Sequence, residues 1–377
     1  MKAQLAVRLL AEQMGWESDS RIAEEFAWLS LLVEYKYDHY QGYTPGSRFF
    51  VSLLSWIAQF PQHEREMAYS LVKDKLAYIS QREMHHLVSL TMPRIQREVR
   101  KAIALERDKP FYLTWADDDA KKRILEMSLR TLYIGLSDGA KIDVFRRENE
   151  GTVSNEQVVG VSEISDKKWD KLREELATRL KENGLTNSSH TFERICLIDD
   201  FTASGSTLIR KEVETGAWKG KVPTFIEQNI KQGRVGSHIA QNCIVHVHHY
   251  IGSAKAREKI KQLLHEFQQN ESQFCFHEPT FSMVLDQDMV IDEKSDPELV
   301  KLLQLYYGAS CEDAKHTGNG IWLGYKQCGL PLILEHNTPN NSIALLWAIS
   351  RRPKDDQHVM KPLFPRKQRH IDHGQSI

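Results

Sequence analysis

Residues 195–207 read Ile-Cys-Leu-Ile-Asp-Asp-Phe-Thr-Ala-Ser-Gly-Ser-Thr. The first four are apolar, as expected for a strand that is buried on both faces. The acids that follow, Asp199 and Asp200, then stand at the carboxyl end of the strand, where open parallel sheets bind their ligands. A small, hydroxyl-rich loop comes next, and we expect a helix over 206–214 after it. This order predicts a strand–loop–helix unit with a binding edge at the two acids.

The loop from Thr202 to Thr207 has the composition of a phosphate cradle. Its backbone amides can turn onto a phosphate, and the helix expected after it would add its positive end. Gly205 permits a close approach of the backbone, while Ser204, Ser206 and Thr207 can donate hydroxyl hydrogen bonds. The paired carboxylates could hold two sugar hydroxyls. An ordinary strand–loop–helix with an acidic strand end is the alternative interpretation.

On both sides of this segment, from about residue 130, short β-rich runs alternate with helical stretches. The expected strands are 131–136, 156–161, 194–199, 243–249, 274–284 and 329–335. The expected helices are 140–149, 166–182, 206–214, 253–268 and 296–307. Such alternation predicts an α/β fold of mainly parallel sheet.

The front of the chain follows a different pattern, because apolar residues recur at helical spacing through residues 1–110. The helices expected there include 47–60, 64–79, one that starts near Gln81 behind a capping box at Ser80 and Glu83, and one after Pro93. We therefore predict a mostly helical, winged-helix-like domain over 1–120 and the α/β domain over 121–352. Residues 353–377, rich in proline, histidine and charge, are expected to form a loose tail.

Composition narrows the class of protein. The chain has 377 residues, 41% of them hydrophobic, and 50 basic side chains against 51 acidic ones, so it has no global basic field that would coat nucleic acid. No apolar run is long enough to span a bilayer, and the amino terminus lacks the apolar block of a signal peptide. The five cysteines are odd in number and form no CxxC pair. We expect reduced thiols, a cytoplasmic location and no membrane partner.

Two further polar clusters follow apolar strands. Ser137, Asp138, Gly139 and Ala140 follow the strand 131–136, and Gly139 could make a tight binding loop there. His336, Asn337, Thr338, Asn340 and Asn341 follow the strand 329–335, and their amides and hydroxyls could contact a base or a sugar. Each cluster has a plain alternative, because glycine, asparagine and threonine also form turns for backbone reasons. Tyr325 and Trp347 could stack on a base or belong to the core.

Histidines and arginines add two weaker signals. His246 and His248 share one face of a strand, a spacing that can bind metal, but no carboxylate or thiol lies near them in sequence. Neutral, hydrogen-bonded histidines are the default, and we predict no metal held directly by side chains. Arg94, Arg97, Arg100 and Lys101 lie at helical spacing and could contact nucleic-acid phosphates. Glu98 and Glu106 interleave with them, so an ordinary solvated face is the alternative.

The segment 195–207 resembles the signature of type I phosphoribosyltransferases, which it matches at Asp199, Asp200, Ser204, Gly205 and Thr207. The resemblance implies that the acidic pair acts at the catalytic centre and binds the 2′- and 3′-hydroxyls of a ribose 5-phosphate, as in phosphoribosyl pyrophosphate or a nucleotide. It also implies a pyrophosphate loop at residues 137–140 and Mg²⁺ on the pyrophosphate. The implied 5-phosphate loop consists of Thr202, Ala203, Ser204, Gly205, Ser206 and Thr207.

One position departs from the family's pattern. Purine-salvage members carry an aspartate three residues after the acidic pair, where it can act as a base toward the purine ring. Ala203 stands there in this chain. A purine-salvage role is therefore not expected.

A wider resemblance concerns the combination of a helical front with this domain. Together with YIGLSDGAKIDVFRR, LIDDFTASGSTL and LPLILEHNTPNNS, it is similar to phosphoribosyltransferase-like effectors of prokaryotic conflict systems, some of them beside retron reverse transcriptases. That implies an antiviral effector whose partners include a reverse transcriptase with its RNA–DNA product. The architecture also resembles a bacterial purine repressor, a ligand-sensing regulator that binds DNA. A flexible loop with catalytic groups, expected within residues 150–190, would distinguish the enzyme from the sensor.

Overall fold

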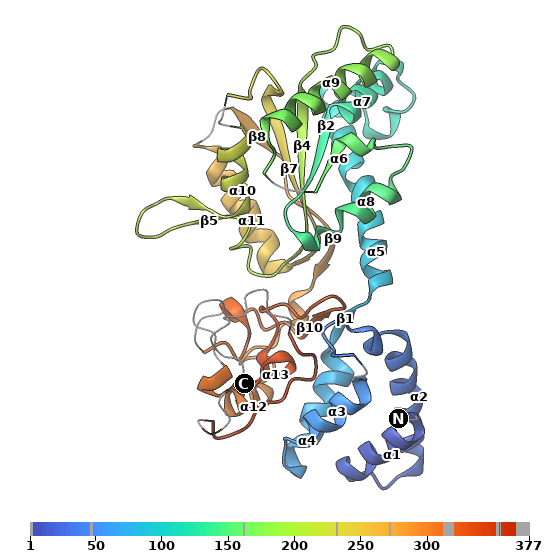
Figure 1. The fold of residues 1–377 in the computed structure, drawn as a ribbon, viewed down its shortest axis with the longest axis vertical. Helices are drawn as coiled ribbons and strands as arrows, with labels where there is room; N and C mark the ends of the chain where they lie inside the picture. The colour runs from blue at the N-terminus through green and yellow to red at the C-terminus, as the bar shows by residue number, and fades with distance from the viewer. Residues whose placement is uncertain are drawn as a thin grey trace. The chain divides into compact units, whose positions relative to one another are not determined.

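The computed structural model describes residues 3–45, 48–160, 163–230, 233–270, 273–311, 320–351, 354 and 356–366. They form two compact units, one of Met1–Glu83 with Asp288–Ile377 and one of Met84–Gln287 (Figure 1). The chain thus divides elsewhere than at the expected limits after residues 120 and 352. The reason is that the helices after Met84 cover the sheet of the second unit, whereas the chain from Asp288 onward folds with the amino-terminal helices.

The second unit is built on a six-stranded sheet. Its strands lie in the order β3 (Val158–Val159), β2 (Thr131–Gly135), β4 (Phe192–Thr202), β7 (Ile239–Ser253) and β8 (Phe274–Phe276), and β9 (Thr280–Leu285) also pairs with β7. Every pairing is parallel. The α/β fold with a mainly parallel sheet is therefore confirmed, and β4, the strand with the acidic pair, lies at its centre.

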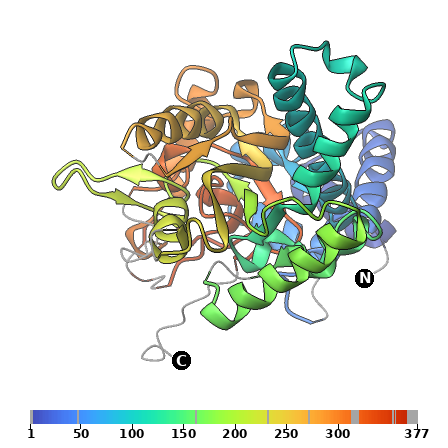
Figure 2. The same cartoon turned by 90° about the horizontal axis from the view of Figure 1, so that it is seen from above.

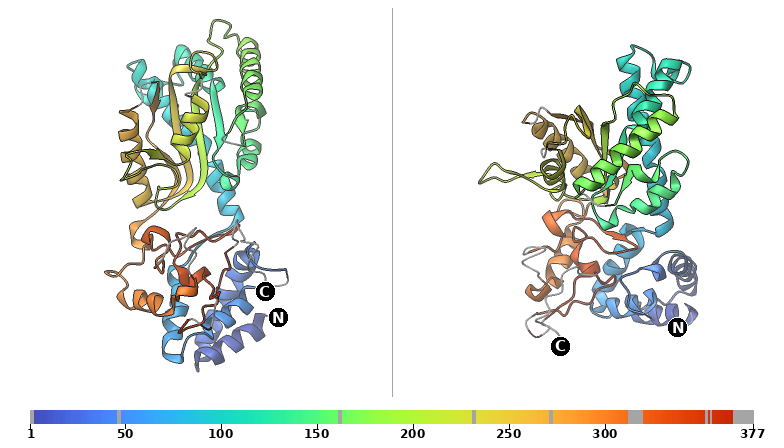
Figure 3. Two further views of the ribbon diagram at one scale, coloured as in Figure 1. Left: turned by 60° about the vertical axis from the view of Figure 1, so that its left-hand side comes forward. Right: turned by 45° about the horizontal axis from the view of Figure 1, so that its top comes forward.

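Helices cover both faces of this sheet (Figures 2 and 3). On one face, the apolar side chains of β4 and β7 join a core with α9 (Asp166–Glu182), α10 (Lys221–Phe225) and α11 (Ala254–Gln268). The opposite face meets α6 (Thr91–Glu106), α7 (Asp118–Leu129) and α8 (Ile142–Glu148). The burial of both faces explains why the strand 195–198 is continuously apolar.

The first unit is mainly helical. It contains α1 (Ala3–Met14), α2 (Asp19–Tyr35), α3 (Phe49–Ile57), α4 (Gln62–Ser70), α12 (Pro297–Tyr306) and α13 (Ala344–Trp347). The short α5 (Gln81–Ser89) spans the limit between the units. A parallel pair of strands, β1 (Ala77–Ile79) and β10 (Leu332–Leu334), completes the first unit.

Strands β1 and β10 correct two expectations. Residues 77–79, expected to end a helix, form a strand, and the strand expected at 329–335 belongs to this small sheet and not to the main one. In the described part of residues 1–120, β1 forms no antiparallel hairpin, so the wing of a winged helix is not seen.

The expected loose tail is partly packed. Met360, Leu363 and Phe364 are buried in the core of the first unit, and the Leu363 and Phe364 amides both bond to the carbonyl oxygen of Leu346. Apolar side chains in this otherwise polar stretch provide the reason. The end of the tail, residues 367–377, lies outside the described residues.

Two general expectations can be compared with the structure. All five cysteines are free thiols, and Cys196 is buried in the core as its place in the apolar strand predicted. In the described part of the chain, no helix has the length and apolar character needed to cross a membrane.

Candidate active site

The site is centred on the carboxyl end of β4. Ile198 pairs with Gly135, the last residue of β2, so β4 continues past the end of its neighbour and carries Asp199 and Asp200 beyond it. The chain after β2 turns over these two acids. Ser137 Oγ donates a hydrogen bond to Asp199 Oδ1 at 2.5 Å.

The residues 137–140 lie against the acidic pair, as the order of the strands predicted. A Cβ atom on Gly139 would collide with the carboxylate of Asp200, so glycine is required for this close approach. The hydroxyl of Tyr250, on β7, donates a hydrogen bond to the carbonyl oxygen of Ala140 at 2.5 Å and thereby fixes the end of the loop. The tight loop is thus built by three neighbouring strands.

Lys221 completes the immediate surroundings of the acids. Its Nζ atom forms an ion pair with Asp199 Oδ2. Burial raises the pKa of Asp199, the neighbouring Asp200 raises it further, and Lys221 and Ser137 act in the opposite direction. A buried carboxylate held by one cation and one hydroxyl is a rigid acceptor suited to sugar hydroxyls.

In the loop after β4, one glycine has the left-handed backbone that glycine favours. Gly205 takes φ +71°, a left-handed value that favours glycine, and a side chain there would meet Ile260 at 3.0 Å. Ser204 and Ser206 are buried, and the Ser206 amide donates to Ser204 Oγ at 3.4 Å. Thr207 is exposed.

The prediction of a helix over 206–214 is wrong. The chain instead forms a protruding hairpin of β5 (Arg210–Lys211) and β6 (Trp218–Lys219), visible in Figures 1 and 2. Gly216 and Gly220 take φ values of +66° and +120°, which permit the return of the chain. The expected positive helix end is therefore absent from this place.

The helix that lies beside the loop is α11, which comes much later in the chain. Ser253 caps α11 by accepting from the Ala256 amide at 3.0 Å, and its hydroxyl donates to the carbonyl oxygen of Ala203 at 2.6 Å. The first turn of α11 thus packs against the phosphate-type loop, and Gly205 lies close to it. Sequence order pointed to the wrong helix because it cannot show which distant element packs on a loop.

Three basic side chains near this loop were not predicted from the sequence. Lys259 Nζ lies 3.1 Å from Ser206 Oγ, and Arg210 Nη1 donates to the carbonyl oxygen of Ser206 at 3.2 Å. Lys221, which is 22 residues from Asp199 in sequence, is joined to the loop by its amide, which donates to Thr207 O at 3.1 Å. Only Arg210 follows the motif closely enough to have been noticed from the sequence.

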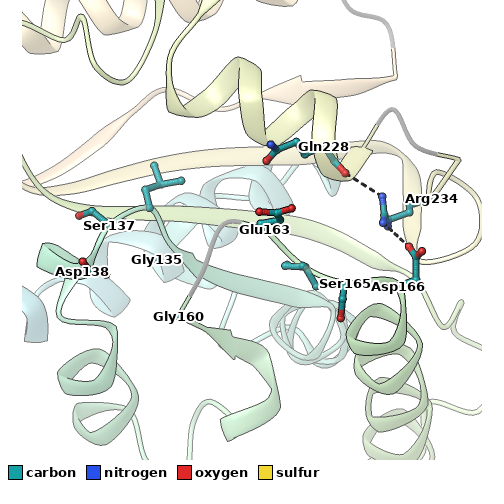
Figure 4. A pocket seen from close by; sticks show the side chains of 11 residues that line it. Gly135, Ser137, Asp138, Gly160, Glu163, Ser165, Asp166, Gln228 and Arg234 are labelled. Atoms are coloured by element: carbon teal, nitrogen blue, oxygen red, sulfur yellow. Dashed lines mark hydrogen bonds and ion pairs between the residues drawn. The ribbon is translucent and has the colours of Figure 1, made fainter.

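A polar cavity of about 870 Å³ adjoins the residues 137–140 (Figure 4). Ser137 and Asp138 line one side, and Glu163 and Gln228 line the centre. Across it, Arg234 donates to Asp166 Oδ1 at 2.6 Å. The cavity is large enough for a second substrate beside the acidic pair.

The cluster after β10 lies in the other compact unit. Thr338 Oγ1 is hydrogen-bonded to the Tyr40 hydroxyl at 2.7 Å, and Asn341 Nδ2 donates to the carbonyl oxygen of Tyr325 at 3.1 Å. His336, Asn337 and Asn340 belong to the same turn. Trp347 is buried and donates to Ser342 O at 2.8 Å, as a core residue would. The structure therefore gives Thr338 and Asn341 contacts within the first unit.

The two histidines on β7 have hydrogen-bond partners. His246 Nε2 and His248 Nδ1 lie 2.7 and 2.8 Å from Thr280 Oγ1. Burial lowers the pKa of His248 to about 3, so the ring is neutral near pH 7. Within the described residues, no group of three or more histidine, cysteine or acidic side chains is placed to hold a metal ion.

Most basic side chains on α6 form contacts with other residues of the second unit. Arg94 donates to the carbonyl oxygen of Ser282 at 3.2 Å. Arg100 donates to Thr114 Oγ1 at 3.0 Å and lies over the ring of Phe111. Lys101 pairs with Glu98 at 2.8 Å, and Arg97 is exposed. These contacts agree better with a structural face than with a free stripe for nucleic acid.

A parallel sheet whose central strand carries two acids close to its carboxyl end, followed by a glycine- and hydroxyl-rich loop, defines a phosphoribosyltransferase-type domain. The model of the PRTase-CE family matches residues 53–366, and the chain belongs to this family. The match covers parts of both compact units, so the family is not defined by the sheet alone. Comparisons with curated proteins and with solved structures find no match.

Proposed function

We propose that the second unit binds a ribose 5-phosphate ligand, phosphoribosyl pyrophosphate or a nucleotide, and acts at its anomeric carbon. The observation that carries this proposal is that Asp199 and Asp200 lie at the carboxyl end of β4, next to the loop 202–207 and in contact with the loop 137–140. The acids would hold the ribose hydroxyls. The loop amides and hydroxyls would hold the 5-phosphate, with positive charge supplied by Lys221, Lys259 and Arg210.

The chemistry would depend on positioning and electrostatics. Pyrophosphate or a base would leave the anomeric carbon through an oxocarbenium-like transition state, and a base, a hydroxyl or water would attack. The loop 137–140 would receive the leaving pyrophosphate, because it adjoins both the acids and the polar cavity. Mg²⁺, which prefers hard oxygen ligands, would bind the phosphate oxygens of the pyrophosphate and neutralise their charge.

We further propose that this activity serves an effector of prokaryotic antiviral defence in the cytoplasm, restrained by a partner such as a reverse transcriptase with its RNA–DNA product. Support comes from the resemblance of three segments and of the domain combination. The alternative is a regulator that binds its ligand at the same site without turnover and also binds DNA.

The test incubates the full chain with phosphoribosyl pyrophosphate, Mg²⁺ and a panel of nucleotides and nucleobases, and identifies products by mass spectrometry. A new or cleaved glycosidic bond that depends on Asp199 and Asp200 is the expected result. Exposed acids on α9 and the hairpin provide a matched control, Glu174→Gln with Glu214→Gln. Tight binding with no product under any condition would favour the sensor, and no binding would reject the proposal.

A further inference from the structure

A second polar cavity of the sheet unit, of about 640 Å³, lies at the other end of the parallel strands. Its lining includes Leu129, the last residue of α7 and two positions before β2, and Gln157, which directly precedes β3. In parallel strands these amino ends lie opposite the carboxyl ends that carry Asp199 and Asp200. The cavity shares no lining residue with the loops 137–140 and 202–207.

Three arginines from two helices line this cavity. Arg146 and Arg147 come from the last turn of α8, and Arg179 comes from the last turn of α9. The acidic side chain in the lining is Glu150. The cavity therefore has a cationic wall, in contrast to the cavity beside the acidic pair.

Two of these arginines have buried nitrogens with no acceptor. Arg179 Nε and Nη1 are buried without a hydrogen-bond partner, and so is Arg146 Nε. In the described part of the chain neither guanidinium forms an ion pair, and Arg146 Nη2 donates only to the carbonyl oxygen of Val158 at 3.3 Å. Burial lowers the pKa of Arg179, and Glu156, Glu175 and Glu182 act in the opposite direction. Both arginines are half-buried, and leaving buried N–H groups without acceptors is costly, so the two side chains favour an anion with several oxygens.

The wall next to the arginines is apolar. Leu125 and Leu129 come from the end of α7, and Leu125 remains 40% exposed. A guanidinium pair beside an exposed leucine surface suits a ligand with a phosphate at one end and a flat, weakly polar ring at the other. Arg147, which pairs with Asp143 at 2.8 Å, lies exposed on the rim.

We propose that this cavity is a second nucleotide-binding site. Arg146 and Arg179 bind the phosphate, and Leu125 and Leu129 contact the base. The site goes beyond the proposed function, since it uses other residues at the opposite end of the sheet. A nucleotide bound there would stabilise the junction of α7, α8 and α9.

Calorimetry with adenosine monophosphate as the probe tests the proposal on the full chain. The measurements use an Asp199→Asn/Asp200→Asn background, which weakens the first site. Binding is expected to persist in this background and to fall at least tenfold on addition of Arg146→Gln with Arg179→Gln. Arg173→Gln, an exposed change on the same helix, should have no effect. Inorganic phosphate should compete, and adenosine should bind at least tenfold more weakly.

A second variant keeps the proposal testable if Arg146→Gln with Arg179→Gln fails to fold. Arg147→Glu changes an exposed side chain on the rim and breaks its exposed ion pair with Asp143. It is expected to weaken the binding of adenosine monophosphate several-fold while thermal unfolding stays cooperative. Binding that is absent, or unchanged in both arginine variants, would overturn the proposal. The result is separable from the first site, because loss of phosphoribosyl pyrophosphate binding in the acid variants reports on that site alone.

Discussion

Lys221 Nζ forms an ion pair with Asp199 Oδ2, although the two residues are 22 positions apart and belong to different elements. The lysine begins α10, and its amide donates to the carbonyl oxygen of Thr207 in the phosphate-type loop. One residue thus connects the acid at the strand end with the loop that follows it. This link couples the ribose-binding and phosphate-binding halves of the proposed site.

Neutralising Asp199 and Asp200 should weaken ligand binding without lowering the free energy of unfolding. Asp199→Asn with Asp200→Asn removes charge-assisted hydrogen bonds, each of which contributes about 1.5–3 kcal/mol, so affinity for phosphoribosyl pyrophosphate should fall by more than tenfold. The raised pKa of Asp199 means that its charged form costs stability at neutral pH. Urea denaturation at pH 7 should therefore find Asp199→Asn as stable as the parent or more so. Calorimetry that gave unchanged affinity would remove the ribose assignment.

Removing the lysine should have the opposite effect on stability. Lys221→Met leaves a buried carboxylate without its cation, which should cost about 1–3 kcal/mol, less than a fully buried pair because Lys221 is partly exposed. The Lys221→Met/Asp199→Asn double variant should recover most of that loss. A double-mutant cycle of denaturation midpoints measures the coupling, and additive effects would show that the ion pair is unimportant.

Gly139 offers a test of the tight loop. Gly139→Ala places a methyl group against the Asp200 carboxylate, so the loop must shift. We expect a stability loss of about 1–3 kcal/mol and at least tenfold weaker phosphoribosyl pyrophosphate binding. Gly160→Ala is the control for stability alone, because its nearest neighbour, Ile142 Cγ2, is 3.6 Å away while Gly160 itself lines the polar cavity. An equal stability loss in the two variants would argue against close contact between the loop and the acid.

Acid should destabilise the second unit through its buried histidines. Burial lowers the pKa values of His248 and His249 to about 3 from an ordinary value of 6.5. A depressed histidine pKa contributes stability that is full above pH 6.5 and is lost as the pH falls toward 3. Each histidine should add a slope of about 1.4 kcal/mol per pH unit below pH 6. His248→Gln should reduce the slope of unfolding free energy between pH 6 and 4.5, whereas His265→Gln, an exposed change, should not.

In cells, the proposed effector should stop growth once its restraining partner is removed. Asp199→Ala with Asp200→Ala should abolish toxicity or phage protection, because the ribose would no longer be held for reaction. The change lies at a strand end, so no large core cavity should open. Immunoblotting and growth curves provide the measurement. A folded double variant that still protects would favour the regulator alternative.

Local sequence determined the central strand and the acids at its end. An unbroken apolar run is a direct consequence of burial on both faces, and the small residues Thr202–Thr207 permit only a tight loop. The helix α9 was predicted at its observed limits, Asp166–Glu182, because its apolar residues recur at helical spacing. These features depend on neighbours within a few positions, which the sequence displays directly.

Only the tertiary structure decided what surrounds that strand. Strand β1 pairs with β10, which lies near the far end of the chain. Lys221 and Lys259 reach the loop from α10 and α11, and α11 supplies the helix end that sequence order assigned to residues 206–214. Pairings between distant segments depend on chain closure and on packing of whole faces, and a short window of sequence contains neither.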